Sequence, residues 1–384
     1  MWTLQEVAVA RNPVFKVGCY ECPAKCFYHL CLESVSRTAE VTPYRRALTA
    51  TPADYRFLSI DMYWVVRQEY QGISRNPSYY QDTLLDLPGV CLHEMLRRHC
   101  ACQATDPRDH IYSLLPAILE VFGTTWKGPT ADYSKPVTEI FEEFSRYLVM
   151  NGAGLELLYL NTRSKSITPL PSWVPDFSAQ TPQHFPERPE VLQMRRPSEV
   201  IGWRKIHLDT AKAAKNGELP LKGQQISSVR FLGGRFPLEE ELSDPESEHH
   251  KRLLSKFFNE AKELCMQMVI AECREFSEAE LEAYVDKQSA TVVDLIVQKS
   301  IPKAGLRNDF AIFSTSSNQL AVSRGDVQQG DIIVLLVGGY CPYIMRPDGT
   351  RFKFIGPCII HGLNETESPV REQDIGSLPT FILC

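Results

Sequence analysis

The stretch that decides the fold is ATDPRDHIYSLL, residues 104–115, where a proline turn leads into an amphipathic helix. Pro107 fixes its own φ angle and favours an extended conformation at Asp106, so the chain turns here. We expect Asp106 to cap the helix, Pro107 to occupy its first position and Asp109 to add charge to its first turn. Apolar residues follow at helical spacing: Ile111, Leu114, Leu115, Ile118 and Leu119. This spacing predicts a helix over residues 109–120 with one buried face.

The flanking sequence predicts a mainly helical region over residues 1–153. A strand is expected at residues 14–17, because four residues of apolar and long side chains precede a Gly turn. Apolar periodicity predicts helices over residues 4–10, 23–36, 55–70, 87–102 and 136–150. Residues 154–245 differ, because prolines crowd the stretch from 169 to 197 and break helices. Short strands are expected there at 155–160, 219–222 and 228–232, and a mobile flap at 178–197.

Residues 246–384 are predicted to hold two helices followed by strands. The helices are expected at 247–269 and 277–299, and Ser277 followed by Glu280 is a capping-box pattern at the start of the second. Asp348-Gly349 between two apolar segments predicts a β-hairpin, whereas Gly233-Gly234 and Gly338-Gly339 are interpreted as turns. The sequence therefore predicts an α+β fold with a helical N-terminal part, a Pro-rich middle and a small antiparallel β-sheet or partial barrel at the C-terminus.

Five ordered segments of the chain resemble fungal heterokaryon-incompatibility (HET) proteins. They are WTLQEVAVA from Trp2, ATDPRDHIYSLL, DYSKPVTEIFEEFSRYLV from Asp132, LPSWVPDFS from Leu170, and the β segment from Gly330 to Gly362. The resemblance covers the downstream part of the family, in which a larger α/β signalling region precedes the WTLQE segment. Since Met1 directly precedes that segment here, we expect a truncated or shortened member. Residues 318–323 also lack the Gly-rich turn of the family.

Composition limits the classes of function. A net charge of −6 argues against a protein that binds nucleic acid through a basic face. No apolar run approaches the roughly 20 residues that a membrane span requires, and the N-terminus lacks a signal-peptide pattern. We therefore expect a cytoplasmic protein with no membrane span, in which the 12 cysteines are mostly buried thiols. The oligomeric state stays open.

Two groups of cysteine and histidine raise the question of a metal site. The first comprises Cys19, Cys22, Cys26, His29 and Cys31, and its CxxC pair is followed by no second pair at zinc-site spacing. The second comprises Cys91, His93, His99, Cys100 and Cys102, which a helix would scatter around its axis. We interpret both groups as structural thiols and histidines, with Cys26 and Cys31 on a buried face, and predict no metal. No nucleotide-loop or dinucleotide motif is present, so no cofactor is predicted.

The predicted site residues fall in the C-terminal strands and among the aromatic side chains. Tyr343, Lys353 and His361 are candidate catalytic residues, because all three can donate a hydrogen bond to a carbonyl oxygen. Candidate substrate-binding residues are Arg346, Tyr63, Trp64, Tyr133 and Trp173. The alternative is that the polar residues are rim residues of an ordinary sheet and that the aromatic residues belong to the core.

Two functions are consistent with these features. The first is a cofactor-independent cyclase or isomerase, of the pericyclase or Diels-Alder type, acting on a terpenoid or polyketide in an apolar pocket. Such an enzyme needs only a shaped pocket and one or two donors, so it leaves little motif in the sequence. The resemblance supports it indirectly, since HET-like genes also occur among fungal biosynthetic genes. The alternative is a non-enzymatic signalling or interaction protein of heterokaryon incompatibility.

Overall fold

The computed structural model describes residues 14–23, 26, 88–89, 92–93, 95–96, 104–123, 126–151, 154–160, 165–179, 217–235, 247–271, 277, 280, 283–285, 287, 311–323, 326–339, 341–363 and 377–384. Their contacts form two units, which we call the helical unit (Met1–Leu170 and Val174–His184) and the sheet unit (Pro171–Trp173 and Phe185–Cys384). The three-part division at 153/154 and 245/246 stays a prediction. The helices expected at 4–10 and 55–70, and all of the expected flap except residues 178 and 179, lie outside the described residues.

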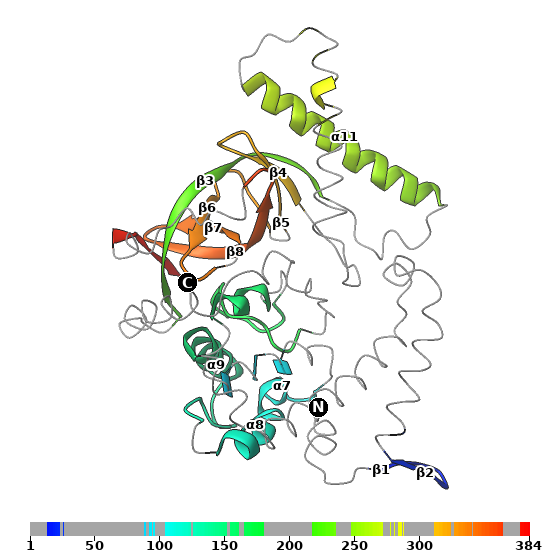
Figure 1. Cartoon of the computed structure of the whole chain (residues 1–384), viewed down its shortest axis with the longest axis vertical. Coiled ribbons are helices and arrows are strands. Elements are labelled where there is room, and N and C mark those ends of the chain that lie inside the picture. The colour runs from blue at the N-terminus through cyan, green and yellow to red at the C-terminus, as the bar shows by residue number, and fades with distance from the viewer. Residues whose placement is uncertain are drawn as a thin grey trace. The chain divides into compact units, whose positions relative to one another are not determined.

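The helical unit contains one hairpin and several helices, which Figure 1 labels. Its elements are β1 (Val14–Val17), β2 (Tyr20–Pro23), α7 (Asp109–Tyr112), α8 (Leu115–Phe122), α9 (Val137–Asn151) and the 3-10 helix η3 (Gly154–Leu160). Strand β1 occurs where it was predicted and pairs antiparallel with β2. Helix α9 confirms the predicted helix, because Ile140, Phe144 and Leu148 are buried at helical spacing. Residues 155–160 were predicted as a strand, which is wrong, since η3 occupies them.

The predicted helix over residues 109–120 is interrupted. Helix α7 ends at Tyr112 and α8 begins at Leu115. Pro116 explains the break, because it has no N–H with which to bond Tyr112 four residues earlier. Asp106 does not cap α7 directly. Its Oδ1 accepts a hydrogen bond from the backbone N–H of Arg108 at 2.9 Å, within the turn that precedes the helix. Of the side chains predicted to face the core, Ile111, Leu114, Leu115 and Ile118 are nonetheless buried, whereas Leu119 is 42% exposed, so its predicted burial is wrong.

The sheet unit contains seven described strands, and the pairings of six of them close into a ring. The ring consists of β3 (Leu219–Arg235), β4 (Ala311–Thr315), β5 (Leu320–Ser323), β6 (Ile332–Leu336), β7 (Pro342–Asp348) and β8 (Arg351–Ile360); the seventh strand, β9 (Thr380–Leu383), pairs with β3 and β8. The order is β4-β5-β8-β7-β6-β3-β9, and a further pairing of β4 with β3 joins the two sides. All pairings are antiparallel except the single β8–β9 bridge at Phe352 and Leu383. The predicted combination of helices with a C-terminal antiparallel sheet is present.

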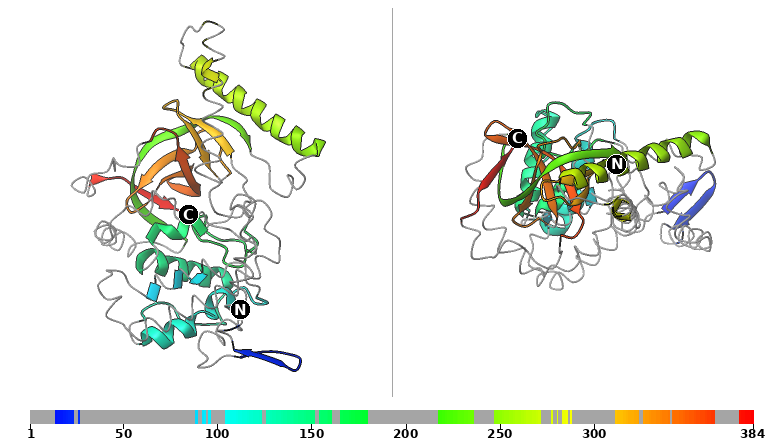
Figure 2. Two further views of the ribbon diagram at one scale, coloured as in Figure 1. Left: turned by 45° about the vertical axis from the view of Figure 1, so that its right-hand side comes forward. Right: turned by 90° about the horizontal axis from the view of Figure 1, so that it is seen from above.

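Side chains fill the interior of this ring. One buried cluster combines Val229, Ala311, Phe313, Ala321, Val327, Ile333, Ile344, Cys358 and Ile360. These residues come from β3, β4, β5, β7 and β8 and the segment around β6, so the cluster joins most strands. Figure 2 shows the ring from two further directions. The hairpin predicted at Asp348-Gly349 joins β7 to β8, with Asp348 paired to Arg351 and a φ angle of 64° at Gly349.

Strand β3 is long and curved, and Figure 1 shows it following the ring of strands. It replaces the two short strands predicted at 219–222 and 228–232. Its first half pairs with β9 and β6, and its second half pairs with β4. Gly233 and Gly234 lie inside it, so their interpretation as turn residues was wrong. Glycine is needed here because a Cβ on Gly233 would lie 2.7 Å from Cγ1 of Ile312 and 3.0 Å from Cδ2 of Leu264.

Helix α11 (Glu248–Ala271) packs on the outside of the ring and confirms the helix predicted at 247–269. Four of its side chains, those of Phe257, Ala261, Leu264 and Met268, pack against Ile312, Leu320 and Val322 of β4 and β5. The capping box is also confirmed, since the N–H and hydroxyl of Ser277 both donate to Oε2 of Glu280. Among the described helices, none has both the length and the apolar character that crossing a bilayer requires.

Candidate functional site

Tyr343 on β7 is a core residue of the sheet. Its side chain is fully buried, and its ring centroid lies 5.9 Å from that of Phe354 on β8. A Cβ on Gly339 would lie 2.5 Å from the Tyr343 ring, so the chain passes very close to this side chain. The tyrosine therefore helps to fill the sheet interior.

Lys353 and His361 lie at the surface. Lys353 pairs with Arg346 in the β7–β8 register, and its ammonium lies 3.4 Å from the carboxylate of Asp348. His361 follows the end of β8, and its backbone N–H donates to the carbonyl of Leu320 at 2.8 Å. Both side chains are exposed, whereas Tyr343 is buried. The three predicted catalytic residues are thus on neighbouring segments of one sheet but do not line a common enclosed site.

Arg346 forms a structural ion pair. Its Nε and Nη2 donate to Oδ1 and Oδ2 of Asp331 at 2.8 and 3.0 Å, and Asp331 is only 2% exposed. Asp331 Oδ2 also accepts from the backbone N–H of Gln328. The hydrogen bonds that Arg346 donates to Asp331 raise the pKa of Arg346. Because its guanidinium neutralises a buried carboxylate, Arg346 on β7 is linked to the turn that precedes β6.

Tyr133 belongs to a cluster that ties its loop to α7. Its hydroxyl donates to Oδ1 of Asp109 at 2.5 Å, and the guanidinium of Arg108 lies 5.1 Å from its ring. Partial burial and this hydrogen bond raise the pKa of Tyr133 to about 12. Arg108 donates to both oxygens of Asp106, which lowers the pKa of that carboxyl. Arg108 and Asp106 therefore form a partly buried ion pair.

Trp173 does not join Tyr133 in the helical unit. Trp173 belongs to the sheet unit, where it is fully buried and its indole N–H donates to the carbonyl of Gly217 at 3.0 Å. Tyr63 and Trp64 lie outside the described residues. An aromatic substrate pocket built from these residues stays a prediction.

Asp176, which lies in one of the resemblance segments, organises the loop of residues 165–179. Its Oδ2 accepts from the N–H and hydroxyl of Ser166 and from the N–H of Ile167, and its Oδ1 accepts from the N–H and hydroxyl of Ser178. Nearby, Lys165 donates from Nζ to the carbonyl of Val174 at 2.8 Å. Burial lowers the pKa of Lys165 to about 8, although the charge of Asp176 opposes the shift. Sequence reasoning missed Lys165, because the local sequence pattern does not predict that this lysine is buried.

The cysteine group near the N-terminus is more exposed than predicted. Cys19 and Cys26 are exposed and Cys22 is intermediate, so the predicted burial of Cys26 is wrong. The hairpin of β1 and β2 places Cys19 at its tip. His29 and Cys31, and all of the second group except His93, lie outside the described residues. Within the part of the chain that the structure describes, no three or more His, Cys, Asp or Glu side chains are placed to hold a metal ion.

An open groove lies between the second half of β3 and the end of α11. We call it the β3–α11 groove; it has a volume of about 570 Å³ and is lined by Arg230, Phe231, Leu232, Gln267, Ile270, Ala271 and Gln329. Ile270 is 72% exposed and Leu232 is 43% exposed, so the groove combines exposed apolar side chains from two elements. Sequence reasoning did not find the groove, although Ile270 stands outside the apolar stripe of α11 at 257, 261, 264 and 268.

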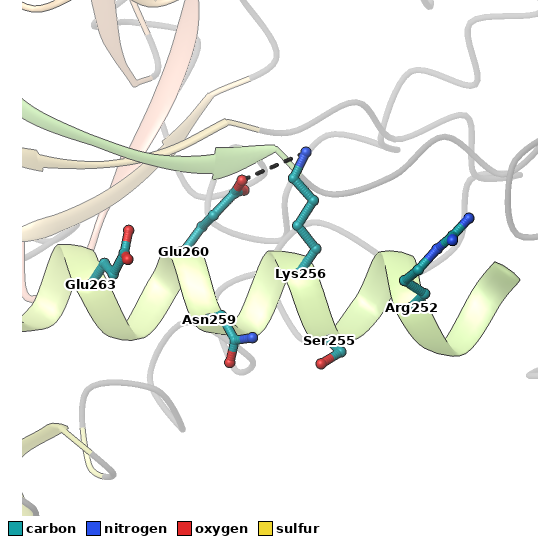
Figure 3. A pocket seen from close by; sticks show the side chains of 6 residues that line it. All are labelled: Arg252, Ser255, Lys256, Asn259, Glu260 and Glu263. Atoms are coloured by element: carbon teal, nitrogen blue, oxygen red, sulfur yellow. Dashed lines mark ion pairs between the residues drawn. The ribbon is translucent and has the colours of Figure 1, made fainter. Parts of the chain in front are cut away.

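A second hollow follows the exposed face of α11 and is polar. It has a volume of about 360 Å³, and Figure 3 shows its lining side chains: Arg252, Ser255, Lys256, Asn259, Glu260 and Glu263. The ammonium of Lys256 lies 3.8 Å from the carboxylate of Glu260, one helical turn away. Such an exposed pair contributes little to binding or stability. This face is a hydrated helix surface and offers no apolar anchor.

Comparison of the chain with family models, with curated proteins and with solved structures gave no match. The resemblance to heterokaryon-incompatibility proteins therefore stays a prediction from the sequence.

Proposed function

We propose that this chain is a non-enzymatic interaction protein of the heterokaryon-incompatibility type and that it binds a partner protein through the β3–α11 groove. The observation that carries the proposal is the exposure of Ile270 and Leu232 in one open groove. Protein interfaces bury a few apolar anchors inside a polar rim, and here Arg230, Gln267 and Gln329 supply such a rim. The predicted cytoplasmic location and the absence of nucleic-acid binding are part of this proposal.

The scaffold around the groove supports this role. Helix α11 is held to the ring by a buried apolar cluster, so the two walls of the groove belong to one packed body. Full burial of an Ile or Leu side chain contributes about 1.5–3 kcal/mol. Because Ile270 is 72% exposed and Leu232 is 43% exposed, burial of Ile270 contributes more, and it can change the affinity for a partner by about tenfold.

The cyclase function stays the other proposal from the sequence. It requires a pocket that encloses an apolar substrate and brings hydrogen-bond donors to one point. Both hollows found in the described residues are open, and the candidate donors Tyr343, Lys353 and His361 do not line a common enclosed site. Partner binding accounts for more of the described geometry.

The test is a pair of α11 variants of equal charge change. Ile270→Asp places a carboxylate in the groove, whereas Ser255→Asp places one on the same helix about 22 Å away along its axis. Proteins retained by the wild-type chain from cells that express it are identified, purified and titrated against all three forms. We expect at least one partner whose Kd rises at least tenfold with Ile270→Asp and stays unchanged with Ser255→Asp. Purified partners that bind all three forms equally would rule out this groove.

A further inference from the structure

Arg230 at the rim of the β3–α11 groove has no carboxylate partner in the part of the chain that the structure describes. Its guanidinium lies 5.1 Å from the ring centroid of Phe231, and within the described residues it forms no hydrogen bond or ion pair. The other described arginines of the strands are paired: Arg235 with Asp326, Arg346 with Asp331 and Arg351 with Glu218. A half-buried guanidinium without an internal carboxylate is suited to an anion supplied from outside.

The described lining of the groove therefore carries positive charge alone. Among the described residues that line it, Arg230 is the single charged one and none is a carboxylate. Opposite charges about 4 Å apart attract each other even at a hydrated protein surface. An acidic group on a bound partner gains this attraction without meeting a like charge, whereas a basic group is repelled. Charge complementarity thus favours a partner segment with an acidic residue beside its apolar anchor.

Two amide side chains stand on the groove walls. Gln267 comes from α11 and Gln329 from the segment before β6, and both are exposed. Neither side chain has a hydrogen-bond partner among the described residues. A carboxamide offers the same donor and acceptor pair as a peptide unit, so it can bond to a main chain whose own groups are not used in a helix. This favours an extended segment over a helical one.

We propose that the occupant of the β3–α11 groove is an extended acidic–apolar segment of the partner protein. An apolar side chain packs against Leu232 and Ile270, an adjacent carboxylate bonds to Arg230, and the main chain bonds to Gln267 and Gln329. The inference rests on the proposed function, because it names the kind of segment that the interaction protein would bind.

A display library of random linear peptides tests the inference on the full chain. Selections are run in parallel on the wild type, Arg230→Glu and Ile270→Asp. On the wild type we expect peptides that place Asp or Glu next to Leu, Ile or Phe. On Arg230→Glu the selected charge should switch to Lys or Arg, because the apolar anchors remain while the rim charge is reversed. Ile270→Asp should select neither class.

The strongest acidic peptide is then titrated by fluorescence anisotropy. We expect the Kd of this peptide to rise at least tenfold with Arg230→Glu. A peptide with its acidic residue changed to Lys should bind Arg230→Glu with a Kd within threefold of that of the acidic peptide for the wild type. Alanine at both Gln267 and Gln329 should weaken binding several-fold, and Ser255→Asp should leave it unchanged. Arg230→Gln serves as the second variant if Arg230→Glu does not fold; it should abolish the acidic preference without creating a basic one.

The outcomes separate the two proposals. The inference would be overturned if the selected peptides depend on Ile270 but show no charge preference. It would also be overturned if they keep an acidic preference with Arg230→Glu or Arg230→Gln. Either outcome would leave the interaction function standing. Peptides that bind equally to Ile270→Asp, or a selection that enriches none, would count against the groove itself and so against both.

Discussion

Lys165 shows how burial changes the chemistry of a single side chain. Its ammonium bonds to the carbonyl of Val174, and burial lowers its pKa to about 8 from an ordinary 10.5. The folded state therefore holds the proton less tightly than the unfolded state does. Between pH 8 and 10.5 the unfolded chain keeps the proton that the folded chain has lost, so stability rises with pH in this window. Below pH 8 both states are protonated, and the folded state bears the full penalty of the buried charge.

We predict that Lys165→Met stabilises the chain at pH 7 by about 1–2 kcal/mol, because the buried charge is removed while the carbonyl of Val174 loses a donor. The rise in unfolding free energy between pH 8 and 10 should become smaller in the variant. Urea unfolding at pH 7, 8, 9 and 10 measures both effects. Lys127→Met, at an exposed lysine of the same unit, should keep the wild-type rise. If the unfolding free energy of Lys165→Met rises with pH as much as that of the wild type, another titrating group causes the rise.

Local chemistry in the sequence predicted some residue contacts but not others. Asp106 and Arg108 are two residues apart, so their pairing follows from the turn that Pro107 imposes. Arg346 and Asp331 are 15 residues apart and meet only because β6 and β7 pair. Arg346 was consequently predicted to bind substrate, whereas its guanidinium pairs with a buried carboxylate.

At the scale of the element, α11 was predictable and its surroundings were not. An apolar stripe with a period of 3.6 residues marks a helix with one buried face. The same stripe does not reveal which strands lie beneath it or where an apolar residue outside it, such as Ile270, faces solvent. Gly233 lacks a Cβ, and this lets β3 pass close to Leu264 and Ile312. The sequence alone does not show that this glycine is needed for the contact between α11 and the ring.

We predict that Gly233→Val loosens α11 from the ring. The added side chain would overlap atoms of Ile312 and Leu264, and overpacking of this kind destabilises by about 1–3 kcal/mol. Hydrogen–deuterium exchange of α11 should become faster, and urea unfolding should shift to lower concentration. Gln224→Val, at an exposed position of the same strand, provides the control and should leave α11 exchange unaltered. Unchanged exchange in Gly233→Val would show that α11 tolerates a side chain there.

At the scale of the whole molecule, the sheet unit joins segments that are far apart in the sequence. Strand β9 pairs with the start of β3, and Leu219 and Leu221 are fully buried beside it. The carbonyl of Cys384 accepts from the N–H and the hydroxyl of Ser172, and the Ser172 hydroxyl accepts from the N–H of Phe354 at 2.8 Å. Residues 171–173, β3, β8 and the last strand therefore stabilise one another.

We predict that deleting residues 380–384 destabilises the sheet unit as a whole. The deletion exposes Leu219 and Leu221 and leaves the backbone edge of β3 without its partner strand. We expect a broader urea transition at lower concentration and increased binding of a hydrophobic dye. Ser172→Ala keeps β9 and removes only the side-chain bonds, so it should lose about 1–2 kcal/mol and retain a sharp transition. A sharp, unshifted transition in the deletion variant would show that the ring is stable without β9.

By itself, the sequence determined the local elements of this protein: the turn at Asp106-Pro107, helices α9 and α11, the capping box at Ser277 and the β7–β8 hairpin. Periodicity, capping and turn chemistry act over a few residues, so they can be read along the chain. Only the tertiary structure decided that Tyr343 is buried, that Arg346 is paired and that Ile270 and Leu232 share an open groove with Arg230, which has no ion-pair partner among the described residues. These properties depend on which distant strands meet, and no local pattern contains that information.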